Sequence, residues 1–354
     1  MTEPTITTRD ELISYLDAAL ALEHATIPPY LTAYYSIDST TNSDAAHIIR
    51  VVAVEEMLHL TLAANVLNAV GGSPDLTRPG FVPSYPAYLP DGEDDFTVDL
   101  RAFSPDAVDT FCNIERPRKA PDAGARLVPH DSGRPTLAAS PTTPGMRFYS
   151  IGEFYDEIID GLSRVAATDP HLFRGDPSRQ VGPEYFYSGG GTVIPVHDLA
   201  SACRALRFIA DQGEGSDSGL YDADGELAHY YRFRQLRLGR YYQPGDQHDL
   251  PSGPKLDIHW DQVRKVKVNA KLADYPAGSE LAAAAEAFNA DYAAFLALMT
   301  RAFNGDPGLL VEAVWHMFRL RDGFNRLMRN PLPGSGGLHA APTFEVPALA
   351  AVMS

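Results

Sequence analysis

The sequence predicts a mainly α-helical protein, in which a four-helix bundle carries long irregular insertions and a C-terminal helical hairpin. Three observations support this prediction. Apolar residues recur at helical spacing in several long segments, capping residues precede some of these segments, and stretches rich in Pro, Gly and Asp separate them. With 354 residues, of which 45% are hydrophobic, the chain has enough apolar side chains to form a buried core.

The first two helices are predicted over residues 8–37 and 44–70. Thr8 is a good N-cap, because a glutamate follows it three residues later, as in a capping box. Pro28-Pro29 should kink or locally break the first helix, since proline lacks the N–H that an inner helical turn needs. Only a short polar loop joins the two helices, so we expect them to form an antiparallel hairpin.

The rest of the chain divides into an insertion, more helices and a C-terminal region. Residues 73–144 are rich in Pro, Gly and Asp and should form an irregular insertion with one short helix after Ser104-Pro105. The bundle domain is predicted over residues 8–245, and a C-terminal region with a helical hairpin at 279–330 follows over 246–346. Some β-branched alternation suggests a small strand pair at 246–276. Further helices are expected over 148–165, 196–212, 225–240, 279–303 and 307–330.

Charge and cysteine content exclude several classes of protein. The chain has 29 Lys+Arg against 46 Asp+Glu, a net charge of −17, which argues against nucleic acid and membrane surfaces as partners. Its two cysteines, Cys112 and Cys203, lie far apart, so no zinc ribbon, iron–sulfur cluster or disulfide framework is expected. We find neither an apolar run of the ~18 residues that a membrane span needs nor a signal-peptide pattern at the N-terminus. The expected location is therefore the cytoplasm.

The helix over residues 44–70 carries two polar residues on its inward face. Apolar residues follow a spacing of three and four along this face, but Glu56 and His59 occupy its centre. A buried carboxylate and imidazole are costly unless they are paired or bind a cation, and the i, i+3 spacing directs both to one place. Glu55 flanks this face and is expected to be an outer or interhelical partner.

Glu23 repeats this pattern in the first helix, where it is the one acid on an otherwise apolar inward line. The hairpin turn centres near residue 40, about 17 residues after Glu23 and about 15 to 18 residues before Glu56 and His59. Since a helix rises ~1.5 Å per residue, all three side chains lie at about the same level of an antiparallel pair. Three ligand-type groups at one level indicate a cation site.

A second Glu-x-x-His motif, Glu226 to His229, is predicted on the helix over residues 225–240. The helix that follows the insertion offers Glu153 and, as a second-tier candidate, Glu157. One Glu on each of two helices and a Glu-x-x-His on each of two others is the ligand set of dinuclear carboxylate bundles. Oxygen and nitrogen donors favour two iron ions, with manganese as the alternative.

Two other interpretations of these residues remain open. Glu214, also a second-tier candidate, could replace Glu226 as a ligand. Alternatively, the acids could form solvated faces or internal salt bridges with arginines such as Arg232. Tyr30 is expected to be a core aromatic, although a tyrosine beside an oxidising metal can relay electrons or protons. Residues 189–191, Gly-Gly-Gly, lack the strand-to-helix context of a phosphate loop and are interpreted as a flexible turn.

Six short segments of the chain resemble one known family. They are residues 22–31, 54–60, 151–155, 212–215, 229–233 and 342–345. They are similar to the ferritin-like domain of the iminophenyl-pyruvate dimer synthase family, which is named for an enzyme of violacein-type bisindole biosynthesis. The resemblance extends over about residues 9–346. It implies a ferritin-like bundle, oxidative chemistry, and metal held by Glu23, Glu56, His59, Glu153 and His229, with Glu226 or Glu214 completing the set.

The functional hypothesis is a di-iron oxidoreductase that uses O2 or peroxide on a small organic substrate in secondary metabolism. The many Tyr and Phe residues are compatible with an aromatic or amino-acid-derived substrate, and the insertion at 73–144 would form a lid or channel. Two alternatives use the same residues: a manganese catalase-like enzyme that disproportionates peroxide, and a non-catalytic metal-binding protein. A second copy of the chain is a candidate partner, bound through the hairpin at 279–330.

Overall fold

The computed structural model describes residues 6–90, 92, 95–118, 148–186, 189–216 and 219–346, and these confirm the mainly helical fold. Residues 91, 93–94 and 119–144 of the predicted insertion lie outside the described residues. The helices are α1 (Arg9–Ser36), α2 (Ser43–Ala69), α3 (Pro105–Ile114), α4 (Ile151–Thr168), α5 (Leu199–Glu214), α6 (His229–Leu238), α7 (Glu280–Phe303) and α8 (Leu309–Met328). Short 3-10 helices cover Pro177–Arg179, Pro183–Tyr185 and Leu272–Asp274.

Helix α1 begins with the predicted capping box at Thr8. The helix continues through Pro28 and Pro29, so of the predicted kink or local break the break is wrong and the kink stays a prediction. Because Pro29 has no N–H, the carbonyl of Ala25 loses its partner four residues on, and the hydroxyl of Tyr85 donates to that carbonyl instead, at 3.3 Å. A side chain from the insertion thus replaces the missing helical hydrogen bond.

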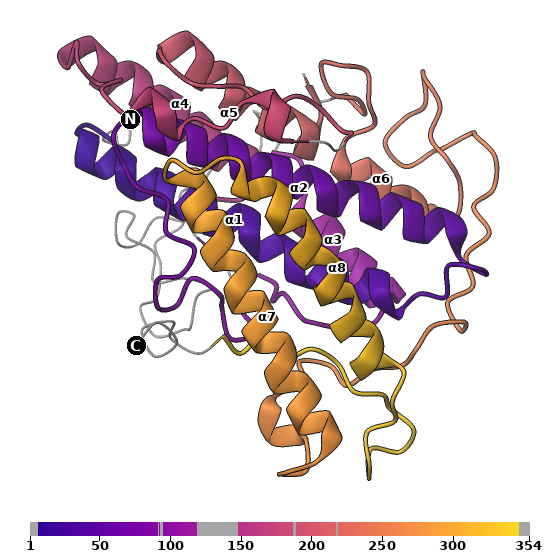
Figure 1. The fold of residues 1–354 in the computed structure, drawn as a ribbon. Helices are drawn as coiled ribbons and strands as arrows, with labels where there is room; N and C mark the ends of the chain where they lie inside the picture. The colour runs from indigo at the N-terminus through magenta and orange to yellow at the C-terminus, as the bar shows by residue number, and fades with distance from the viewer. Residues whose placement is uncertain are drawn as a thin grey trace.

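The bundle is formed by helices that pack in pairs (Figure 1). Helices α1 and α2 form the predicted hairpin, α4 packs on α5, and the two short helices α3 and α6 pack against each other. Helices α5 and α6 also contact α2, and α4 contacts α1. These contacts enclose one interior into which α1, α2, α3 and α6 can each direct a side chain.

The C-terminal helices α7 and α8 form a second hairpin, which crosses over α1 and α2 in Figure 1. Its residues lie in the same hydrophobic core as those of the bundle. Phe344, near the end of the described chain, packs against the rings of Phe288, Tyr292 and Phe324. The division of the chain at residues 245 and 246 stays a prediction.

The strand pair predicted at 246–276 is wrong. Among the described residues this segment has only isolated bridges, such as Val263 with Ile37, and the 3-10 helix over Leu272–Asp274. The reason is that its β-branched residues Val263 and Val266 bridge to different segments, at Ile37 and at His339, and not to each other.

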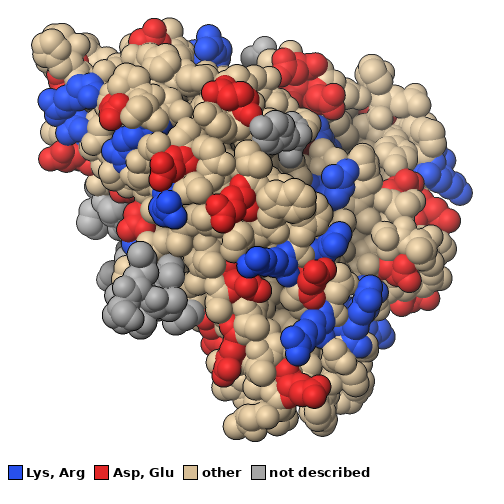
Figure 2. Space-filling model, viewed as in Figure 1, with Lys and Arg blue, Asp and Glu red and all other residues tan. Residues whose placement is uncertain are grey.

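None of the described helices is both long enough and apolar enough to cross a bilayer. On the face drawn in Figure 2, acidic and basic side chains are interspersed among uncharged ones.

Candidate metal centre

Five ligand-type side chains meet in the interior of the bundle. Each is at most 3% exposed to solvent, although all are polar. They come from four helices or their ends: Glu23 from α1, Glu56 and His59 from α2, Glu115 from the C-cap of α3, and His229 from the first residue of α6.

Glu56 lies between the two histidines. Its Oε1 is 2.8 Å from Nδ1 of His229 and 3.7 Å from Nδ1 of His59. Glu23 Oε2 lies 3.3 Å from the same nitrogen of His59, and Glu115 Oε2 lies 3.6 Å from the same nitrogen of His229. The cluster therefore has an α1/α2 half (Glu23 and His59) and an α3/α6 half (Glu115 and His229), with Glu56 shared between them.

Both histidines turn the same ring atom toward this centre. Nε2 of His59 lies 2.9 Å from Oε1 of Gln212, and Nε2 of His229 lies 3.0 Å from Oε2 of Glu55. Since both partners are acceptors, Nε2 carries a proton, and Nδ1 is the ring atom directed inward. Outer hydrogen bonds of this kind fix the tautomer and orientation of metal-binding histidines.

Glu55 has the outer role that the sequence predicted for it. Besides His229, the guanidinium of Arg232 donates to its Oε2 at 2.7 Å. Burial would raise the pKa of Glu55, but these two partners hold it below its ordinary value, so the carboxylate stays charged.

Each of the three carboxylates in the cluster is held by a hydroxyl through one oxygen only. Tyr155 donates to Oε1 of Glu23 at 2.5 Å, Thr26 donates to Oε2 of Glu56 at 2.9 Å, and Tyr30 donates to Oε1 of Glu115. The other oxygen of each carboxylate is the one that faces a histidine Nδ1. Three oxygens and two nitrogens thus converge while their second atoms are already bonded.

The electrostatics of this cluster favour a bound cation. Burial and the neighbouring charge of Glu115 raise the pKa of Glu56 to about 7, because three carboxylates share one dry site. Oε1 of Glu56 and Nδ1 of His229 are buried without a hydrogen-bond partner among the described residues. Ligand atoms of Glu56, His59 and His229 all lie within 4.8 Å of one another.

Space and donor chemistry also fit metal. Gly213 borders the centre, since a Cβ atom there would lie 3.4 Å from Oε2 of Glu115. The absence of a side chain at this position keeps the region beside that oxygen open. Carboxylate and imidazole donors without thiolate suit iron or manganese, so the residues present fit the metal pair that the sequence predicted.

Two predicted ligands lie elsewhere. Glu153 is in the first turn of α4, where its carboxylate accepts from the backbone N–H of Tyr149 at 3.1 Å, and Tyr155 contacts the cluster in its place. The side chain of Glu226 is 69% exposed and lies 3.5 Å from Arg232.

The position of Glu226 has a local cause. The predicted helix over residues 225–240 begins only at His229, because Oδ1 of Asp222 accepts from the backbone N–H groups of Asp224 and Glu226 and holds a turn there. The Glu-x-x-His motif at 226–229 is therefore not helical, and its two side chains separate.

The two second-tier candidates are also outside the cluster. Glu157 lies on α4 and pairs with Arg164 at 2.6 Å. Glu214 is buried, but its carboxylate accepts from the backbone N–H groups of Gly152 and Arg118, so it caps the start of α4.

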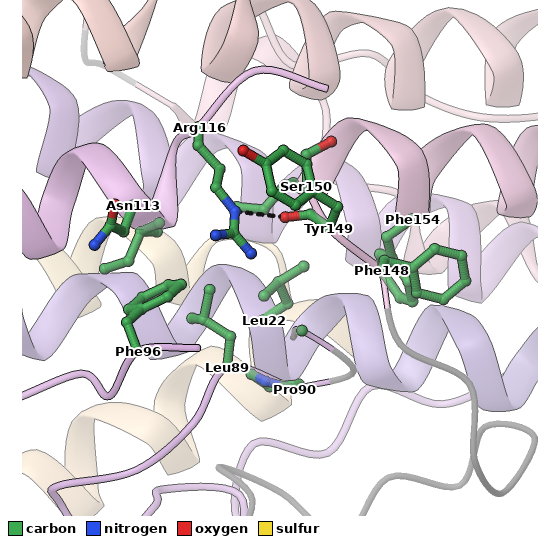
Figure 3. A pocket seen from close by; sticks show the side chains of 13 residues that line it. Leu22, Leu89, Pro90, Phe96, Asn113, Arg116, Phe148, Tyr149, Ser150 and Phe154 are labelled. Atoms are coloured by element: carbon green, nitrogen blue, oxygen red, sulfur yellow. Dashed lines mark hydrogen bonds between the residues drawn. The ribbon is translucent and has the colours of Figure 1, made fainter. Parts of the chain in front are cut away.

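Glu115 is the member of the cluster that the sequence did not reveal. It has no histidine partner at helical spacing, and its only signal is an acid at the end of the short helix predicted after Ser104-Pro105. The next residue, Arg116, fixes it: its Nε donates to the carbonyl of Tyr149 at 2.6 Å, and its guanidinium covers the Tyr149 ring (Figure 3). The guanidinium also pairs with Asp95 at 2.5 Å.

A cavity of about 660 Å³ adjoins the outer partners of both histidines. Its wall includes Glu55, Gln212, Arg50 and Arg232, and residues 189–191 form another part of it. At position 190 a Cβ atom would come within 2.4 Å of the Glu55 side chain, so only glycine allows this close approach. The side chains of Glu55 and Gln212 thus lie between this cavity and the two histidines of the cluster.

A helical bundle with Glu and His side chains directed inward from facing helices defines the ferritin-like class of proteins. Residues 16–238 match the Ferritin-like family, and the chain belongs to that family.

Two similar proteins extend this finding. Dichlorochromopyrrolate synthase from Lentzea aerocolonigenes is 27% identical over 394 residues, which cover 96% of this chain but only 36% of the relative. The chain therefore spans about a third of the length of that enzyme. A ferritin-like protein from Caulobacter vibrioides, known from a crystal structure, is 25% identical with a TM-score of 0.65, and the match covers 96% of this chain and 99% of that one.

Proposed function

We propose that the chain is a metal-dependent oxidoreductase with two iron ions that acts with O2 or peroxide on a small organic substrate. The observation that carries the proposal is the convergence of three carboxylate oxygens and two histidine Nδ1 atoms whose second atoms are already hydrogen-bonded. Metal-free, such a cluster is costly to bury. A structural role alone gives no reason for it.

In this proposal, Glu23 and His59 would hold one ion and Glu115 and His229 the other, with Glu56 available to both. A bound iron pair supplies redox chemistry with O2 or peroxide. Gln212 and Glu55 would hold the two imidazoles with Nδ1 directed inward. Buried aromatic and aliphatic side chains around the cluster exclude water from it.

The cavity of about 660 Å³ is the proposed substrate site, since it falls within the range of ordinary ligand pockets. Its wall carries Arg50 and Arg232 together with the carboxylates of Glu55, Asp224 and Glu226. Groups of both charges suit a substrate with an ammonium and a carboxylate, as an amino acid has. Glu55 and Gln212 join this wall to the two histidines. A substrate bound there would lie next to the groups that orient the metal ligands.

Secondary metabolism and an aromatic substrate are part of the proposal. The similarity of the chain to dichlorochromopyrrolate synthase supports both. The resemblance of its sequence motifs to the iminophenyl-pyruvate dimer synthase family supports them as well. Because the chain spans 36% of that relative, its substrate need not be the same. The cytoplasmic location stays a prediction.

The test is the metal content of protein purified without chelators, followed by O2 consumption with aromatic amino acids and their keto acids. We expect about two iron ions per chain and substrate-dependent O2 uptake. If the protein contains manganese in place of iron, the activity to assay is the disproportionation of peroxide. Negligible metal after anaerobic reconstitution, with the helical content intact, would overturn the proposal.

A further inference from the structure

The outer face of α8 carries exposed apolar side chains. Six large hydrophobic side chains are exposed in the described part of the chain, and four of them lie on this helix. We call these four the apolar row: Val311, Val314, Trp315 and Phe318, with exposed fractions of 38%, 43%, 67% and 46%. Residues three, four and seven positions apart share one side of a helix. The row therefore forms one continuous strip on the surface, on the helix that lies in front of α2 in Figure 1.

The other side of α8 is occupied by packing within the chain. Its residues Leu310, Ala313, Leu320 and Phe324 are buried in the common hydrophobic core. The apolar row is not needed for that packing, since its members remain exposed. Two of them are aromatic, and the centroids of their rings lie 5.7 Å apart. Contiguous exposed apolar side chains of this kind mark interaction sites on proteins.

The order of the side chains makes the apolar row complementary to itself. Two valines come first and two aromatic residues follow, so the midpoint of the row lies between Val314 and Trp315. If a second α8 lies antiparallel across this midpoint, Val311 faces the partner's Phe318 and Val314 faces the partner's Trp315. Each large ring then meets a small side chain, which favours close packing. A parallel pair would instead place tryptophan against tryptophan and phenylalanine against phenylalanine.

Two charged residues beside the apolar row are complementary in the same arrangement. Glu312 and Arg319 are exposed and seven residues apart, so they lie on the same flank of α8. Neither has an ion-pair partner among the described residues. In the antiparallel pair Glu312 lies only ~3 Å along the helix axis from the partner's Arg319, a distance that these long side chains can span. The two-fold symmetry forms this ion pair twice, whereas a parallel pair would bring like charges together.

We propose that the apolar row is the contact surface of a symmetric dimer, in which α8 packs antiparallel against α8 of a second copy of this chain. The row also borders a hollow of about 450 Å³, so the rings of the partner have room beside it. A contact of one helix pair is at the small end of protein interfaces, below about 1,200 Å², and we expect a dimer that dissociates at about micromolar concentration. No residue of the metal cluster belongs to the row, so this proposal does not depend on the proposed function.

Two matched valines test the position of the contact by sedimentation of the full-length protein over a range of concentrations. Val314 in the apolar row and Val268 outside it are both 43% exposed. Val314→Asp places a carboxylate against the partner's Trp315 and should weaken the dimer at least about tenfold. Val268→Asp should dimerise like the unchanged chain, and circular dichroism verifies the fold of both. A monomeric unchanged chain at the highest concentrations, or equal dimerisation of the two variants, would overturn the proposal.

Charge reversals test the direction of the two helices. Glu312→Arg and Arg319→Glu should each weaken the dimer about three- to tenfold at low salt, because both ion pairs then become repulsive. The variant with both reversals should recover the original affinity. An equal mixture of the two single variants should form a mixed dimer that is tighter than the dimer of either variant alone. Unchanged dimerisation of both single variants would refute the antiparallel arrangement, since it is expected if the helices are parallel.

Lipid vesicles test the other kind of surface that an apolar row can contact. Vesicles of neutral phosphatidylcholine, with and without anionic phosphatidylglycerol, are sedimented with the full-length protein. We expect the protein to remain in the supernatant in both cases. A chain that is monomeric in solution and binds vesicles, with the binding lost in Val314→Asp, would assign the row to a membrane surface and refute the dimer.

Discussion

In the α1/α2 half of the proposed centre, Glu23 and His59 lie well inside helices of 28 and 27 residues. In the α3/α6 half, Glu115 is the C-cap of a 10-residue helix and His229 is the first residue of another. The first half is positioned by regular helical geometry. The second is positioned by tertiary hydrogen bonds at chain ends, so the two halves should differ in how firmly the protein holds them without metal.

Glu56 belongs to both halves and gives the largest expected effect. Glu56→Gln keeps the shape of the side chain but removes the negative oxygen between the two histidines. We therefore expect the metal content to fall from about two ions per chain to nearly none. Elemental analysis, with circular dichroism to verify the fold, measures this. Glu153→Gln is the control and should retain the metal, because its carboxylate caps α4. Retention of both ions by Glu56→Gln would refute a shared ligand.

The comparison predicts separable losses for the two histidines. His59→Ala and His229→Ala should each retain about one ion per chain, and the double variant nearly none. The ion that remains in His59→Ala should be the more weakly bound, because it depends on the α3/α6 half. Stepwise chelation of each variant measures this order. Complete loss of both ions from either single variant would mean that the halves do not bind separately.

A smaller effect is expected from the outer partners. Gln212→Ala and Glu55→Ala should each weaken metal binding by about 10- to 100-fold, since the histidines lose their orienting bonds. The effect at Glu55 should be the larger, because Arg232, 8% exposed, then keeps only the exposed carboxylate of Glu226 as an ion-pair partner. Competition with a chelator gives the affinities.

A buried hydrogen-bonded pair far from the centre provides the control for these variants. Asn289 and Thr343 bond to each other in the C-terminal region, so Asn289→Ala should lower stability and leave metal affinity unchanged. Equal weakening by Asn289→Ala would show that the losses at Glu55 and Gln212 reflect general destabilisation.

The same contrast explains what the sequence could predict. Counting residues from the hairpin turn placed Glu23, Glu56 and His59 at one level, and the structure brings them together. This worked because both helices are long and continuous, so that periodicity and rise fix the positions of the side chains. The helices of the bundle were predicted for the same reason.

The residues of the α3/α6 half could not be predicted by counting along helices. Glu226 lies outside the centre because Asp222 forms a turn there and α6 begins only at His229. A periodicity argument assumes that residue 226 is already part of the helix. Glu115 lies in the centre because α3 packs on α6 and Arg116 is hydrogen-bonded to Tyr149. Both are contacts between segments that are distant in the sequence. His229 was predicted as a ligand on a helix, and it stands instead at a helix end.

Cys112 offers the most sensitive probe of how firmly the α3/α6 half is held, since it lies in α3 one turn before Glu115. Burial raises the pKa of its thiol to about 12, so about one molecule in ten thousand is thiolate at pH 8. Alkylation in the folded protein should therefore be slow at pH 8 and should rise about tenfold per pH unit toward pH 12. In the unfolded chain the increase should end near the ordinary thiol pKa of about 8.5.

Bound metal should slow the alkylation of Cys112 further, because it ties Glu115 and with it the end of α3. Cys203, which is buried on α5 and also has a raised pKa, should respond less to metal. The single-thiol variants Cys203→Ser and Cys112→Ser allow the two rates to be measured separately by mass spectrometry. If metal slowed both thiols equally, its effect would be a global stabilisation, and the α3/α6 half would be no looser than the α1/α2 half.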